Sequence, residues 1–179
     1  DTTELSVGAR WYDIAVDFEG SANSSFYNGF GNPDTQQFGS NLSAQYAPGN
    51  ANGYPDKAET DGVIGKVTYS WKPSEDKMYY VTWSEGFRPG LLNRPVGRTS
   101  ADGSYSVPPS VDSDEITNIE FGWKNVLQDG RLRFNGSIFR VDVSGLQSTI
   151  FDPSIVNLFF SDNAADAEIK GVEGDFIYY

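Results

Sequence analysis

The side chains of this chain that could do chemistry are carboxylates, hydroxyls and arginines, because the sequence contains no histidine and no cysteine. The acidic residues gather in three groups: Asp112/Asp114/Glu115, Asp162/Asp166 and Glu173/Asp175. Two carboxylates that flank a sugar bond can hydrolyse it, but the sequence gives no separation between these groups and no sign of a raised pKa. We therefore favour solvated loop charge over a glycosidase site.

Metal and cofactor chemistry has little support in the sequence. Asp152, or Asp102 with Gly103, could offer oxygen ligands to calcium, but the spacing is not that of an EF-hand loop. The phosphate-binding glycine motifs and the GxSxG nucleophile motif are missing from the sequence. Without histidine or cysteine, the usual pairs of nucleophile and base cannot be built. We expect no enzyme activity, no cofactor and no metal site.

The basic cluster of the sequence is Arg88, Arg94 and Arg98. Guanidinium groups suit carboxylate or phosphate recognition, so an anionic ligand is one interpretation. Pairing with nearby acids is the other, and the better supported, since 25 acidic residues outnumber 13 basic ones and the formal charge is −12. The same charge would repel nucleic acid, which we exclude as a partner.

Alternation of apolar and polar residues predicts six antiparallel strands that would position these groups. The expected strands cover residues 5–18, 63–71, 77–87, 115–126, a stretch from 132 onward and a stretch from about 168 to 179. In the first strand the apolar positions change parity after Tyr12, which predicts either a bulge or the end of the apolar environment.

Connections between these strands alternate between short and long. Tight turns are expected at Pro73-Ser74-Glu75-Asp76 and at Leu127-Gln128-Asp129-Gly130. The long connections are residues 20–60, residues 88–112 and roughly 20 residues before Glu168. A rim of short turns opposite a rim of long loops is what a transmembrane β-barrel requires.

The polar strand faces carry many charges, which are Arg10, Lys66, Glu120, Lys124, Arg133, Glu173 and Asp175. An unpaired ion in a dry core costs several kcal/mol, so a soluble sandwich would not enclose this face. A water-filled lumen, or a lumen filled by a polar plug, removes the objection.

Aromatic residues lie on the opposite faces, at Trp11, Tyr69, Trp71, Tyr79, Trp83 and Trp123. They suit an interfacial girdle of a membrane barrel, and equally the packed face of a soluble sheet. The aromatic pattern alone leaves both interpretations open.

Three segments resemble motifs of TonB-dependent outer-membrane receptors. The run Tyr79-Tyr80-Val81-Thr82-Trp83-Ser84-Glu85-Gly86-Phe87-Arg88-Pro89-Gly90, followed by Leu91-Leu92-Asn93-Arg94, resembles their Y-x-S-x-S-x-G-F-R-P-G stretch. Residues 115–124, followed by Asp129-Gly130-Arg131-Leu132-Arg133 and Asn135, are similar to their E-x-x-x-N-x-E-x-G-x-K … D-G-R-x-x-x-N block. Residues 167–173 match their A-x-I-K-G-V-E segment. The three motifs occur in the family's order.

The resemblance implies an all-β, antiparallel transmembrane barrel of about 22 strands in the outer membrane of a Gram-negative bacterium, closed by a plug. Such receptors bind a scarce ligand, such as a ferric siderophore, cobalamin or a glycan, and import it with energy from the TonB–ExbB–ExbD complex. Residues 1–179 would then be part of one barrel domain, surrounded by lipid and lipopolysaccharide. No plug, TonB box or closing strand is recognisable, so we expect a fragment.

The matched motifs carry over no ligand residue. We predict ligand-facing loop positions at Arg88, Arg94, Tyr27, Phe30, Phe151 and Phe160. The alternatives are a secreted carbohydrate-binding β-sandwich, which would bury its aromatic faces against a second sheet, and a passive porin or adhesin barrel.

Overall fold

A computed structural model describes residues 2–17, 57–93, 98–155 and 159–179. Its strands are β1 (Thr3–Asp17), β2 (Lys57–Ser74), β3 (Lys77–Arg88), β4 (Leu91–Leu92), β5 (Ser110–Val111), β6 (Asp114–Leu127), β7 (Leu132–Ile150) and β8 (Phe160–Tyr178). Within these described ranges, no helix is long and apolar enough to cross a bilayer.

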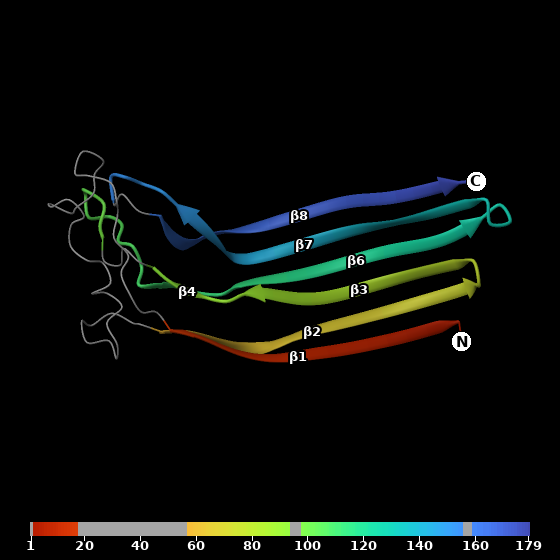
Figure 1. Ribbon diagram of the computed structural model, residues 1–179, viewed down its shortest axis with the longest axis horizontal. Helices are drawn as coiled ribbons and strands as arrows, with labels where there is room; N and C mark the ends of the chain where they lie inside the picture. Colours follow the sequence, from red (N-terminus) through yellow and green to blue (C-terminus); the bar gives the residue numbers. More distant parts are fainter. Residues whose placement is uncertain (1, 18–56, 94–97, 156–158) are drawn as a thin grey trace.

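Six strands form one antiparallel sheet in the order β1-β2-β3-β6-β7-β8, as the alternation predicts. Both tight turns lie at one end of the sheet, and the connecting segments that carry β4 and β5 lie at the other (Figure 1). The turn after β6 places Gln128 and Asp129 at φ 54° and Gly130 at φ 88°. Glycine, and to a lesser degree aspartate, tolerates this left-handed conformation, which explains why the chain reverses here.

Side chains alternate between two faces of the sheet. What we call the apolar face carries Leu5, Val7, Trp11, Val63, Val67, Tyr69, Trp71, Tyr79, Val81, Trp83, Ile119, Phe121, Trp123, Ile138 and Val172. What we call the polar face carries Arg10, Lys66, Thr68, Tyr80, Thr82, Glu120, Lys124, Asn135, Ser137, Glu173 and Asp175. The registers bring like residues of neighbouring strands side by side, so each face is continuous across the sheet.

The apolar band runs obliquely across the hydrogen-bonded rows. On β1 the band extends toward the loop end of the sheet as far as Trp11, which pairs with Val63. That pair lies nearer the loops than the row that contains Val67, Trp83 and Ile119. On β8 it ends lower, at Val172, which pairs with Ile138. A level band crossed by tilted strands produces this drift, and strands of transmembrane barrels are tilted by roughly 35–45°.

No second sheet covers the apolar face in the described part of the chain, where most of its large side chains are exposed. Trp71 and Val172, for example, are 47% and 72% exposed. A β-sandwich with the aromatic face buried against another sheet is therefore not the architecture of these residues.

The parity change in the first strand is not caused by a bulge. β1 pairs with β2 without interruption from Thr3 opposite Trp71 to Asp17 opposite Lys57. Of the two alternatives, the end of the apolar environment is the one that the register supports. Beyond Trp11 the half-buried apolar residues Ile14 and Val16 lie on the polar face.

Two predictions about β8 and the connection that precedes it are wrong. β7 continues to Ile150 and β8 begins at Phe160, so the connection is much shorter than roughly 20 residues and the last strand starts well before Glu168. The register shifts between Val143 and Gln147, and Gly145 adopts φ 63° there. This bulge continues the ladder into a region whose sequence no longer alternates, which hid the strand from pattern analysis.

Candidate functional site

Asp114 is the centre of a polar cluster at the loop end of the sheet. It is the first residue of β6 and lies opposite Arg88, the last residue of β3. The Arg88 side chain donates to Asp114 through Nε, at 2.8 Å, and through Nη2. The backbone amides of Arg88 and Gln147 donate to the same carboxylate at 3.1 and 3.3 Å. Asp114 is 0% exposed, so these donors replace the water that the charge has lost.

This cluster lies beyond the apolar band. On β3 the charged residue Glu85 follows Trp83 on the apolar face. Arg88 lies five residues beyond Trp83, which is about 17 Å along a strand. The hydrogen bonds from Arg88 are the main cause that lowers the pKa of Asp114 below its ordinary value, and burial opposes them. The carboxylate is therefore charged in the folded chain at neutral pH.

Asn93 ties the β3–β6 connection to β8. Its Nδ2 donates to the carbonyl oxygens of Pro108 and Ser161, at 3.0 and 2.8 Å. Its Oδ1 accepts from the amide of Ser161 at 2.7 Å. The side chain is 4% exposed and links residues 68 positions apart. Asn93 follows the first motif by three residues, but no sequence pattern indicates this role.

Gln147 and Asn163 fasten the same connection from β7 and β8. Gln147 Nε2 donates to the carbonyl oxygens of Pro89 and Asp112, at 2.9 and 2.8 Å. Asn163 Oδ1 accepts from the amide of Asp112 at 2.8 Å, and its Nδ2 donates to the carbonyl of Gly145 at 2.6 Å. We call Arg88, Asn93, Asp114, Gln147 and Asn163 the rim clasp.

A small apolar core lies beside the rim clasp. Val107 and Phe160 are buried, and Tyr105 packs against them with its ring centroid 5.9 Å from that of Phe160. The Tyr105 hydroxyl donates to Asp162 at 2.7 Å. Burial, with this hydrogen bond as the second cause, raises the pKa of Tyr105. The connection between β3 and β6 therefore has its own packed interior.

The structure places three of the six predicted ligand-facing residues. Arg88 is bound to Asp114 and its side chain is 50% exposed. Phe160 is 3% exposed and belongs to the apolar core. Phe151 is exposed, and its ring lies 5.0 Å from that of Phe159, also exposed. The other three, which are Tyr27, Phe30 and Arg94, lie outside the described residues. The structure does not bring Arg88, Phe151 and Phe160 together as one site.

Asp102 and Asp152, the two possible calcium ligands, accept local hydrogen bonds instead. Asp102 accepts from the hydroxyls of Ser100 and Ser104, at 2.6 and 2.8 Å, and these bonds lower the pKa of Asp102 to about 2. Asp152 accepts from the amide and hydroxyl of Ser154. In the described ranges, acidic residues form no group of three or more that could hold a metal ion.

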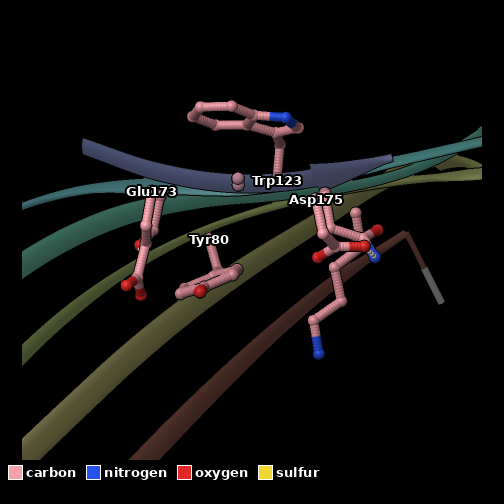
Figure 2. Close-up of a pocket in the computed structure, with 9 residues that line it drawn as sticks. Tyr80, Trp123, Glu173 and Asp175 are labelled. Atoms are coloured by element: carbon pink, nitrogen blue, oxygen red, sulfur yellow. Dashed lines mark hydrogen bonds between the residues drawn. The ribbon is translucent and has the colours of Figure 1, made fainter. Parts of the chain in front are cut away.

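The polar face contains a shallow hollow of about 340 Å³ near the turn end of the sheet. Tyr80, Glu173 and Asp175 lie on one side of the ribbon there, and Trp123 lies on the other (Figure 2). The Tyr80 hydroxyl donates to Glu120 at 2.6 Å, and Asn135 donates to Asp175 at 3.3 Å. The hollow offers charges and hydrogen-bonding groups to a polar partner.

Aromatic rings lie over the glycines that pair with them across the sheet. Tyr80 is opposite Gly122 and Trp123 is opposite Gly136, and a Cβ on either glycine would collide with the ring. Tyr12 over Gly62 and Phe139 over Gly171 repeat the arrangement on other strands. Each ring covers backbone that a glycine leaves bare, which stabilises the pair and fixes its register.

Comparison with known proteins agrees with this architecture. A family model described as "TonB dependent receptor-like, beta-barrel" matches residues 1–179. The structure is similar to that of the ferric-catecholate import receptor Fiu from K12 E. coli in its closed form, with a TM-score of 0.51 and 17% sequence identity. The match covers 98% of this chain and 23% of that receptor, so this chain spans about a quarter of its length. A search of curated proteins gave no match. At this identity, the structural likeness shows the fold alone.

Proposed function

Since the chain belongs to the TonB-dependent receptor-like β-barrel family, we propose that it forms one sector of the barrel of an import receptor in the outer membrane of a Gram-negative bacterium. The receptor binds a scarce extracellular ligand and moves it inward with energy delivered by TonB, ExbB and ExbD. No bond of the ligand is broken, so the receptor is a transporter and not an enzyme.

The observation that carries this proposal is the contrast between the two faces of one sheet. The apolar face is exposed over six strands and matches a hydrocarbon environment. The polar face holds Lys66, Glu120, Lys124, Glu173 and Asp175, which require water or a polar partner. A barrel wall between lipid and a hydrated or plugged lumen satisfies both faces at once.

The rim clasp supports a receptor with ordered extracellular segments. It ties the β3–β6 connection to β8 at Asn93 and Asp112, and to β7 at Asp112. A ligand site built on such an anchored loop keeps its geometry, whereas a free loop would lose conformational entropy on binding. A passive porin or adhesin barrel shares the architecture but lacks a plug and energy coupling, which separate the two functions.

A ferric siderophore is the first ligand to test, because Fiu is named as a ferric-catecholate import receptor. Cobalamin and glycans are the alternatives. The ligand-facing role proposed for Arg88, Arg94, Tyr27, Phe30, Phe151 and Phe160 is best tested at Phe151, whose exposed ring forms a pair with Phe159. Exposed aromatic pairs suit flat or aromatic ligand groups.

The test is uptake by the intact receptor in a host that lacks receptors of its own. Radiolabelled ferric siderophores, cobalamin and oligosaccharides are supplied to matched cells with and without functional TonB. We expect one ligand to accumulate only when TonB is functional. Equal accumulation in both strains would show passive diffusion, and no accumulation of any of the three ligand classes would contradict the proposed function.

A further inference from the structure

Two cations interrupt the apolar face on β7 and β8. Arg140 lies directly opposite Lys170, two residues along each strand from the apolar pair Ile138 and Val172 and on the same face. Two residues further toward the loops, Asp142 pairs with Glu168 on this face. Moving away from the turn end, the surface therefore changes from apolar to basic to acidic within four residues of each strand.

The cations form a connected network with the acids above them. Arg140 Nη2 lies 2.9 Å from both Asp142 and Glu168, and Lys170 Nζ lies 2.7 Å from Glu168. The side chains of Arg140 and Lys170 are 53% and 61% exposed. A guanidinium has five N–H donors and an ammonium has three, so both cations keep donors for a further acceptor.

An apolar hollow of about 680 Å³ begins at these two cations. Its other walls include Ile119, Phe121, Ile138 and Val172 of the apolar band. A ligand that fits this surface has hydrocarbon below and an anionic group above. The position toward the loop end of the sheet corresponds to the outer leaflet of the proposed barrel.

The equivalent place on β1 and β2 has the opposite charge. There the last apolar pair, Trp11 and Val63, is followed by Asp13 opposite Asp61. The basic pair is therefore a local property of β7 and β8 and not a general feature of the band's upper edge. A specific site explains this difference better than a uniform interfacial girdle.

We propose that Arg140 and Lys170 bind a phosphate group of lipopolysaccharide, with its acyl chains over Ile138 and Val172. The inference rests on the proposed function, because it needs the apolar face to lie in the outer leaflet. Phosphate accepts charge-assisted hydrogen bonds from both cations, and basic side chains at a membrane surface attract anionic headgroups. Asp142 and Glu168 orient the cations and compete with the phosphate for them.

The test measures lipid binding by the intact receptor, inserted into lipid vesicles and then transferred to detergent. The probe is purified lipid A with both phosphates, compared with the same lipid after removal of its phosphates. We expect the double variant Arg140→Gln/Lys170→Gln to bind phosphorylated lipid A about tenfold more weakly and the dephosphorylated lipid unchanged. The matched control Arg10→Gln/Lys66→Gln removes the same charge from the polar face and should change binding less than twofold.

A second variant keeps the test decisive if the first one folds poorly. Asp142→Asn/Glu168→Gln removes the competing acids, so binding of phosphorylated lipid A should become severalfold tighter. Equal binding by the wild type and both double variants would overturn the proposal. The same holds if free inorganic phosphate competes for the site as strongly as phosphorylated lipid A does. Failure of the wild type to insert into vesicles would instead contradict the proposed function, so the two failures are distinguishable.

Discussion

The strand wall and the rim clasp are stabilised in different ways. Between the tight turns and Trp83, backbone ladders join the strands, and many side chains on both faces are exposed. Beyond Arg88, buried polar side chains such as Asn93 and Asp114 join segments that are distant in sequence. In the proposed barrel, lipid would cover one face of the wall and water or a plug the other, whereas the side chains of the clasp are buried within the chain itself.

The comparison predicts that the largest destabilisation follows from a change in the clasp. Asp114→Ala should lower the free energy of unfolding by about 3–5 kcal/mol, because it leaves two backbone amides without their acceptor and removes the charge-assisted hydrogen bonds from Arg88. Urea unfolding of the intact receptor in lipid, followed by protease cleavage within residues 98–113, measures the effect. Asp112→Asn is the matched control, since Asp112 enters the clasp through its backbone. An equal effect of both variants would contradict the assignment.

Acid should destabilise the rim clasp, as Asp114→Ala does. Because the pKa of Asp114 is lowered in the folded chain, its contribution to stability is present above the ordinary aspartate value of 3.8 and disappears as the pH falls through the folded pKa. Protease cleavage in the β3–β6 connection should therefore rise in strong acid. Asp114→Asn should show high cleavage at neutral pH and a weaker dependence on acid. An unchanged acid profile in that variant would exclude Asp114 as the titrating group.

The second largest effect should separate the two faces of the wall. Val81→Arg places a charge between Tyr79 and Trp83, inside the apolar band, and should cost about 2–4 kcal/mol. Thr82→Arg, one residue away on the polar face, should cost far less. Folding yield in vesicles and urea midpoints measure both variants. Similar losses for the two variants would remove the distinction between the faces.

A smaller effect is expected when one tie of the clasp is lost. Asn93→Ala should destabilise the connection by about 2 kcal/mol, since it leaves the Ser161 amide and two carbonyl groups without a partner. Hydrogen exchange at the Ser161 amide reports the loss directly. Faster exchange at Ser161, with unchanged exchange at Phe121 in the wall, is the expected pattern. Equal acceleration at both positions would show that clasp and wall unfold together.

The smallest effect should come from a glycine of the wall. Gly122→Ala displaces the Tyr80 ring and breaks its hydrogen bond to Glu120, at a cost of about 1 kcal/mol. In a Tyr80→Ser background the same change should be nearly neutral, because the methyl group then meets open space. A double-mutant cycle of unfolding free energies measures the coupling. No coupling would contradict the close pairing of ring and glycine.

The sequence predicted the wall better than the clasp, and the reason is the range of the interactions. Alternation of Ile119, Glu120 and Phe121 identifies two faces from adjacent residues, and Asp129-Gly130 identifies a turn locally. The clasp joins Arg88 to Gln147, which lie 59 positions apart, through polar residues whose types fit any loop. Pairing of aromatic rings with glycines depends on register, which no single strand reveals.

The most direct test of the central claim is the environment of three consecutive residues on β6. These 179 residues contain no cysteine, so Ile119→Cys, Glu120→Cys and Phe121→Cys each give a single spin label in an intact receptor whose cysteines outside this chain are replaced by serine. Collision with oxygen reports lipid, and collision with a water-soluble nickel chelate reports an aqueous lumen. We predict high oxygen accessibility and low nickel accessibility at positions 119 and 121, and low oxygen accessibility and high nickel accessibility at position 120. A plug that packs closely against position 120 would lower its accessibility to both probes. Equal accessibility at the three positions, or an oxygen maximum at 120, would contradict the account.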